Sequence, residues 1–242
     1  MADGERIARG ALPASKVLGD FVGSSVGAKV LMALTGVVLW GFLIGHLVGN
    51  LQVFQAPDAI NSYAVFLHTI GHGAALWVVR AVLAGCLALH VVMGLRLAAK
   101  NRAARPVQYA KTRRLRTSPA ALWMAASGVL LFVFLVFHLN HFTTGLLDPA
   151  LFDHRDAQGR QDVHKMVWIA FKNPVIVVVY LVSQLVVVSH LLHGTASVWQ
   201  SVGVNHPVWT PVLSGIGRSI ALLIFLGNVA IPLVILVAWG NP

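Results

Sequence analysis

The sequence predicts an all-α integral membrane protein with five transmembrane helices. Of its 242 residues, 57% are apolar and only 11% are charged, and the mean hydropathy is +0.76. Because soluble domains carry about a quarter charged residues, most of the surface of this chain must face lipid. The apolar residues also gather in runs long enough to cross a bilayer. These two observations exclude a water-soluble enzyme.

Five apolar runs reach the length of about 20 residues that a helix needs to cross a hydrocarbon core about 30 Å thick. They cover residues 27–49, 74–97, 119–145, 174–199 and 214–239. Pro174 begins the fourth run, where a missing N–H costs nothing, and Pro232 is expected to kink the fifth. We expect residues 1–242 to form a single membrane domain with residues 1–26 as a cytoplasmic amphipathic segment, and residues 52–73 and 146–173 to be loops.

Positive charge between the second and third runs predicts how the chain is inserted. The residues that carry it are Arg96, Lys100, Arg102, Arg105, Lys111, Arg113, Arg114 and Arg116. Cytoplasmic loops carry an excess of Lys and Arg, so we expect this loop and the N-terminus in the cytoplasm of a bacterial-type inner membrane, with the C-terminus outside. The net charge of +10 is then explained mainly by orientation in the membrane rather than by nucleic-acid binding. Docking of an acidic cytoplasmic partner is the further role that so dense a loop allows.

Histidines occur in four of the five runs, although ionisable residues within spans are rare and usually functional. With a rise of about 1.5 Å per residue, His46 lies roughly 26 Å from Lys29 and His138 roughly 27 Å from Ala120, near the cytoplasmic ends of their runs. His90 lies only about 9 Å from Arg96, and His190 about 14 Å from Trp199. The runs therefore place two histidines at an outer level and two at an inner level.

Two histidine pairs at two heights, each split between two helices, indicate bis-histidine ligation of two b-type haems in a helical bundle. A neutral imidazole gives one nitrogen to the iron, and its N–H needs an acceptor. We expect a Ser, a Thr or a backbone carbonyl one turn earlier to serve.

Local sequence chooses among neighbouring histidines. Residues 42–47 (FLIGHL) resemble residues 134–139 (FLVFHL), which favours His138 over His141. His90 and His190 both begin an H-x-x-x-G pattern, which favours His190 over His193. A depth comparison alone would match His193 to His90 slightly better, so both alternatives stay open.

Other kinds of site receive less support. A dinuclear zinc or iron site needs carboxylates nearby, and the five runs contain no Asp or Glu. The single cysteine, Cys86, cannot build a cysteine-based zinc or iron–sulfur site. A haem-free transporter whose histidines form a proton path is the remaining alternative.

The chain resembles the dihaem cytochrome b membrane-anchor subunit of succinate dehydrogenases and fumarate reductases, the succinate:quinone oxidoreductase family. The resemblance covers nearly the whole chain and is carried by residues 24–29 (SSVGAK), 45–50 (GHLVGN), 89–95 (LHVVMGL), 137–139 (FHL), 189–194 (SHLLHG) and 197–199 (SVW). It implies His46 and His138 on the outer haem and His90 and His190 on the inner haem. It also implies cytoplasmic flavoprotein and iron–sulfur partners, and a membrane quinone, most often menaquinone, as the substrate.

Two arginines and one loop are further candidates. Arg80, about 9 Å below the outer edge, and Arg96 at the inner edge are expected to bind haem propionates, and snorkelling to the headgroups is the alternative for each. The resemblance implies proton-active residues near the outer haem. The loop of residues 52–73 offers Tyr63, His68 and His72 for the quinone, with the two histidines sharing a helical face. An ordinary wetted loop is the alternative.

The resemblance predicts an electron-transfer subunit that links succinate oxidation to quinone reduction. The nearest rival is the cytochrome b subunit of another quinone-linked enzyme, a hydrogenase or a formate dehydrogenase, which also uses histidine-ligated haem in a small bundle. The partner proteins distinguish these two functions.

Overall fold

The computed structural model describes residues 13–104 and 119–238 of the chain. It is 86% helical, without strands in the described residues. Five helices are long and apolar enough to cross a membrane, namely α2 (Ser25–Asn50), α4 (Ala74–Ala103), α5 (Pro119–Phe142), α8 (Pro174–Ser201) and α9 (Trp209–Val237). The predicted all-α fold with five transmembrane helices is confirmed, and the chain is a multi-pass membrane protein.

Shorter helices connect the long ones. They are α1 (Ala14–Gly23), the 3₁₀ helix η1 (Leu51–Phe54), α3 (Pro57–Thr69), the 3₁₀ helix η2 (Ile70–Gly73), α6 (Pro149–Phe152) and α7 (Val163–Lys172). The expectation that residues 52–73 and 146–173 form loops is therefore wrong. Helices α3 and α7 are too short and too polar to stand out as apolar runs, yet each buries one face against the bundle.

Local chemistry sets the ends of several helices. The side-chain oxygens of Ser24, Asp162 and Asn173 accept hydrogen bonds from first-turn amides of α2, α7 and α8 at 2.8, 3.0 and 2.9 Å, as N-caps do. Helix α5 ends at Phe142 rather than at residue 145, because Gly145 has a φ of 69° and cannot continue a right-handed helix. Helix ends thus follow caps and backbone angles rather than the limits of the apolar runs.

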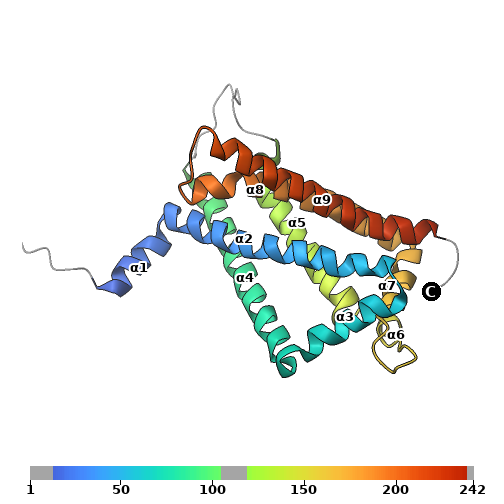
Figure 1. Cartoon of the computed structure of the whole chain (residues 1–242). Coiled ribbons are helices and arrows are strands. Elements are labelled where there is room, and N and C mark those ends of the chain that lie inside the picture. Colours follow the sequence, from blue (N-terminus) through green and yellow to red (C-terminus); the bar gives the residue numbers. More distant parts are fainter. Residues whose placement is uncertain (1–12, 105–118, 239–242) are drawn as a thin grey trace, which may run out of the picture.

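The long helices form two packed pairs with a fifth helix beside them. Helix α2 packs along α4, and α5 packs along α8, while α2 also contacts α8 and joins the pairs. Helix α9 packs along α8 and touches α2 and α7 (Figure 1). Residues 105–118, which hold much of the predicted basic loop, lie outside the described residues.

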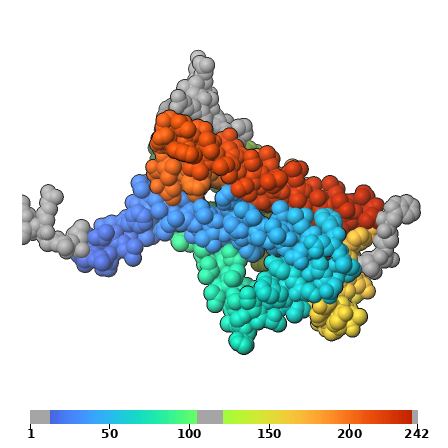
Figure 2. Space-filling view, in the orientation of Figure 1, coloured from blue at the N-terminus to red at the C-terminus, as the bar shows by residue number. Residues whose placement is uncertain are grey.

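The two ends of the bundle differ. At one end, called the α1 end, Ala28 packs with Met93 and Leu97 beneath α1. At the other, called the α7 end, α3, α6 and α7 gather beside the ends of α2 and α5, and a larger apolar cluster includes Phe171, Tyr180 and Ile235. Figure 2 shows α1 projecting from the molecule at the α1 end, with α3 and the α6–α7 region together at the opposite end.

Candidate functional site

His46 of α2 and His138 of α5 face each other near the α7 end. Their ring centroids lie 5.8 Å apart with the ring planes at 87°. Phe42 stacks on His46 at 5.3 Å, and the hydroxyl of Tyr180 on α8 lies 3.1 Å from Nδ1 of His138. The Tyr180 contact occupies Nδ1, so Nε2 is the nitrogen of His138 that remains for a metal.

His90 of α4 and His190 of α8 form a second pair nearer the α1 end. Their ring centroids lie 6.4 Å apart with the planes at 60°. Nδ1 of His90 lies 3.0 Å from the carbonyl oxygen of Met32 and 3.2 Å from Oγ1 of Thr35, both on α2. Because a carbonyl only accepts hydrogen bonds, Nδ1 of His90 carries the hydrogen and Nε2 keeps its lone pair.

The spacing of both pairs suits a metal ion between the rings. With metal–nitrogen bonds of about 2.0 Å, two imidazoles on opposite sides of one metal have their centres about 6 Å apart. Within residues 13–104 and 119–238, no group of three or more His, Cys, Asp or Glu side chains is arranged so that it could hold a metal ion. Each pair therefore offers two nitrogen ligands, and a porphyrin would supply the remaining ligands of an iron ion held between them. The residues present fit a b-type haem at each level.

The competing histidines lie beside these pairs rather than within them. Nδ1 of His141 contacts the Tyr180 hydroxyl at 3.0 Å, and its ring packs on Phe142 at 4.1 Å. The ring that faces His90 is that of His190, not His193. The facing rings are thus the four that the sequence contexts favoured.

A Thr, a Ser and a backbone carbonyl serve as the acceptors, as expected, but they lie on neighbouring helices rather than one turn earlier in the same helix. Thr35 on α2 reaches His90 on α4, and Oγ of Ser127 on α5 lies 3.0 Å from Nδ1 of His190 on α8. The α2–α4 and α5–α8 pairs, which pack side by side, therefore also fix the orientation of the two imidazoles.

A repeat in the sequence contains these two acceptors. Thr35 and Ser127 each stand 11 residues before a paired histidine, His46 and His138, and each is followed by Gly-Val. The glycines leave room for the rings of the other pair: a Cβ at Gly36 would lie 3.2 Å from Cε1 of His90, and one at Gly128 would lie 3.7 Å from Cε1 of His190. A hydroxyl residue, a glycine and a histidine at this spacing could have identified Thr35 and Ser127 from sequence.

The two arginine candidates have different surroundings. Arg96 donates hydrogen bonds to the carbonyl oxygens of Val22 and Gly23 at 2.8 and 2.7 Å, and Lys100 also donates to Gly23. These cations cap the C-terminus of α1, where carbonyls lack helical partners. The guanidinium of Arg80 lies 5.0 Å from the centre of the Trp77 ring. Arg96 is thus committed to α1, whereas Arg80 makes a cation–π contact near the α7 end.

Of the three quinone candidates, the structure brings only Tyr63 close to a histidine pair. A Cβ at Gly49 would lie 2.7 Å from Cε1 of Tyr63, so the phenol packs on α2 just beyond His46. His68 and His72 are exposed. Their predicted common helical face is wrong, because α3 ends at Thr69 and His72 adopts a φ of 56° in the turn to α4.

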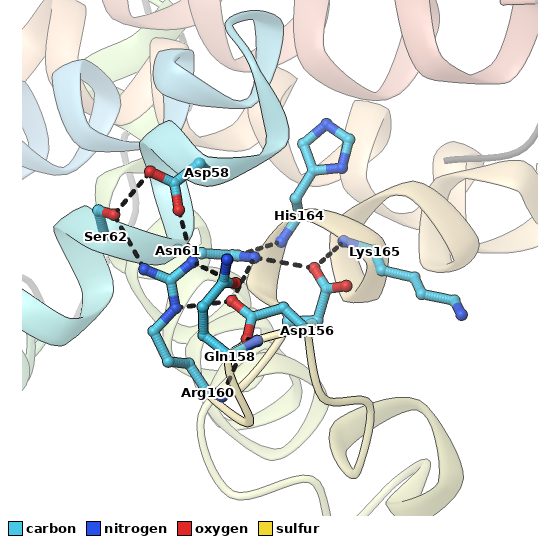
Figure 3. Close-up of polar contacts among 9 residues, drawn as sticks. Asp58, Asn61, Ser62, Asp156, Gln158, Arg160, His164 and Lys165 are labelled. Atoms are coloured by element: carbon cyan, nitrogen blue, oxygen red, sulfur yellow. Dashed lines mark hydrogen bonds and ion pairs between the residues drawn. The ribbon is translucent and has the colours of Figure 1, made fainter.

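A polar network that the sequence did not reveal fastens α3 to the segment before α7 (Figure 3). Its centre is Asn61, which is only 2% exposed. The Asn61 amide donates to Asp162 at 3.1 Å, and its oxygen accepts from the backbone N–H of His164 at 3.0 Å. Single-sequence patterns could not show this, because the partners are about a hundred residues apart.

Arg160 completes the network from the same segment. It donates to Asp156 at 2.7 Å, to Ser62 at 3.1 Å and to Asp58. Burial alone raises the pKa of Asp156, but the hydrogen bonds from Arg160 outweigh it and hold that pKa below its ordinary value. The carboxylate of Asp156 is therefore charged at neutral pH and ties the segment to α3 through Arg160.

Comparisons with protein-family models, with curated proteins and with solved structures find no match to this chain. The functional assignment therefore depends on the residues and their geometry.

Proposed function

We propose that this protein is the membrane-anchoring dihaem cytochrome b subunit of a succinate:quinone oxidoreductase. The observation that carries the proposal is the facing of four histidines in two pairs on four helices. Three of these imidazoles have a hydrogen-bond partner at Nδ1, which leaves Nε2 for iron. The sequence motifs around the histidines resemble those of this family, and they favour succinate:quinone oxidoreductase over other quinone-linked enzymes.

In this proposal His46 and His138 hold one b-type haem and His90 and His190 hold the other. When bound, each haem supplies a one-electron carrier whose potential depends on its ligands and surroundings. Hydrogen bonds at Nδ1 keep three of the four imidazoles, those of His90, His138 and His190, in one tautomer. Arg80 is the candidate partner for a propionate at the α7 end, while Arg96 serves α1.

The α1 end is proposed to face the cytoplasm, because the basic residues that follow α4 favour that side. A flavoprotein and an iron–sulfur protein would dock there, since the single cysteine of this chain cannot hold an iron–sulfur cluster. Oxidation of succinate to fumarate releases two electrons and two protons. A quinone, proposed to be menaquinone, takes up two electrons and two protons to form quinol near Tyr63 at the α7 end.

The decisive experiment is a dithionite-reduced minus oxidised spectrum of the purified chain, with a pyridine haemochrome assay to count haem. We expect two b-type haems per chain. One haem would restrict the proposal to one level. Absence of haem from folded protein, expressed with haem supplied, would overturn it and favour the haem-free transporter.

The partners decide the enzyme. Solubilisation with a mild detergent and affinity capture of the full chain should retain a flavin-containing subunit, an iron–sulfur subunit and succinate:quinone oxidoreductase activity. Capture of hydrogenase or formate dehydrogenase subunits instead would keep the dihaem cytochrome and refute the succinate assignment.

A further inference from the structure

Tyr180 joins two histidines of α5 through a single hydroxyl group. Its oxygen lies 3.1 Å from Nδ1 of His138 and 3.0 Å from Nδ1 of His141. The phenol side chain is only 6% exposed. No other residue in the described part of the chain contacts two histidine nitrogens through one atom.

The chemistry of the three groups allows one consistent arrangement of hydrogens if His138 is an iron ligand, as the proposed function requires. Nδ1 of His138 then carries its hydrogen and donates it to the Tyr180 oxygen. The hydroxyl hydrogen of Tyr180 is left to be donated to Nδ1 of His141. His141 thereby becomes the acceptor that fixes the tyrosine, while His138 keeps Nε2 free.

The surroundings hold the phenol in this position. Rings of Phe134, Phe142 and Phe171 lie 5.4, 5.8 and 5.0 Å from the Tyr180 ring, mostly edge to face. Such contacts favour one ring orientation. The Tyr180 hydroxyl also has no water to turn to in an apolar bundle, so it must keep its histidine partners.

The other half of the bundle lacks an equivalent group. Tyr180 stands ten residues before His190, and the position ten residues before His90 is Arg80. An arginine cannot accept a hydrogen bond from an imidazole N–H. Among the described residues, no hydrogen-bond partner reaches the ring of His46, whose close neighbours are Phe42 and His138.

We propose that Tyr180 is the positioning residue that selects His138 over His141 as a haem ligand and lowers the potential of the haem at the α7 end. An acceptor at Nδ1 makes an imidazole a more basic ligand, and a more basic ligand favours ferric over ferrous iron. Donation from Tyr180 to His141 polarises the hydroxyl and strengthens its acceptance from His138. This inference depends on the proposed function.

The test is a redox titration of both haems in the full-length, purified protein and in Tyr180→Phe. We expect two haems to remain and the potential of one of them to rise. At a fixed ambient potential the ratio of reduced to oxidised haem in that component should increase about threefold, or about 30 mV at 59 mV per tenfold change. A purely structural role would change haem content but not one potential selectively.

Ser127→Ala is the matched control, because it removes the Nδ1 partner of His190 at the other level. Ser127→Ala should raise the potential of the haem whose potential Tyr180→Phe leaves unchanged. Retention of two haems with both potentials unchanged in Tyr180→Phe, or movement of the same component in both variants, would refute the inference alone. A wild-type protein without haem would instead refute the proposed function.

His141→Leu provides a second test should Tyr180→Phe fail to accumulate. It keeps the tyrosine oxygen but removes its acceptor, so we expect two haems and a smaller rise in the same component. Unchanged potentials in this variant would also count against the inference.

Discussion

The two histidine pairs lie in one bundle but are supported in different ways. Near the α1 end, both imidazoles are held by groups on the adjacent helix, Thr35 and the Met32 carbonyl for His90 and Ser127 for His190. Near the α7 end, only His138 has a polar partner among the described residues. The repeated pattern of hydroxyl residue and glycine thus supports both imidazoles at one level, whereas the other level has no such repeated support.

The two ends of the bundle also differ in how much structure covers the helix ends. At the α1 end the cations of Arg96 and Lys100 satisfy the last carbonyls of a single short helix. At the α7 end three added helices and a network across about a hundred residues cover the bundle. The α7 end, where the quinone chemistry is proposed, is therefore the more extensively covered end of the bundle.

The largest expected effect is a loss of haem when a facing histidine is replaced, with no loss when its neighbour is replaced. His138→Ala and His190→Ala should each lower the haem content from two per chain to one, because a single imidazole lacks its opposing ligand. His141→Ala and His193→Ala should retain two. The pyridine haemochrome assay checks all four variants, and loss of haem in the His141 or His193 variant with retention in its neighbour would reverse the ligand choice.

Much of the fold follows from sequence because apolar length is a strong signal in a membrane protein. The five long helices were predicted from their runs alone. Helices α3 and α7 were missed, because their stability comes from contacts such as Asn61 with Asp162, which join residues distant in sequence. Hydropathy reports the lipid-facing majority of residues and says little about such pairings.

The two levels of histidines were also predictable, because helix rise converts sequence position into height, and local sequence context favoured His138 and His190 over their neighbours. Their hydrogen-bond partners were not, since height does not tell which helices lie side by side. The correct acceptor of His90 is on α2 and that of His190 is on α5, which only the packing of the pairs decides. Comparison of the two halves for repeats would have supplied the missing signal at Thr35 and Ser127.

The second prediction concerns the Asn61 network that holds α3 to the segment before α7. Asn61→Leu leaves the Asp162 carboxylate and the His164 N–H without their partner, so we expect a loss of about 2–3 kcal/mol in stability. A lower midpoint of thermal unfolding in detergent measures it. Asn140→Ala is the control, because the half-buried Asn140 donates to the Val136 carbonyl of its own helix and accepts from Thr144 four residues later. Its loss breaks no contact between helices, so it should lower the midpoint much less.

The third prediction concerns the contact between α3 and α2. Gly49→Ala introduces a Cβ that would lie 2.7 Å from the Tyr63 ring, so the phenol must move away from the His46 level at a cost of about 1–2 kcal/mol. Gly41→Ala meets nothing within 4 Å and should be neutral. The measurements are the thermal midpoint of unfolding and the apparent KM for quinone. Equal behaviour of both variants would show that Tyr63 does not pack on α2 in the membrane.

The smallest expected effect is a dependence on pH at the α7 end. Because the folded-state pKa of Asp156 is lowered, its pairing with Arg160 contributes stability at neutral pH, and the contribution disappears as the pH falls below the ordinary carboxyl pKa of about 4. Arg160→Gln should therefore lower the thermal midpoint at pH 7 and have progressively less effect toward pH 3. Arg155→Gln, at an exposed position in the same segment, should have little effect at either pH. A deficit of Arg160→Gln that stays constant across this range would mean that Arg160 acts through Ser62 and packing rather than through the carboxylates. The stability that the Arg160 network gives to the α7 end would then not depend on pH, although its ion pairs predict that it should.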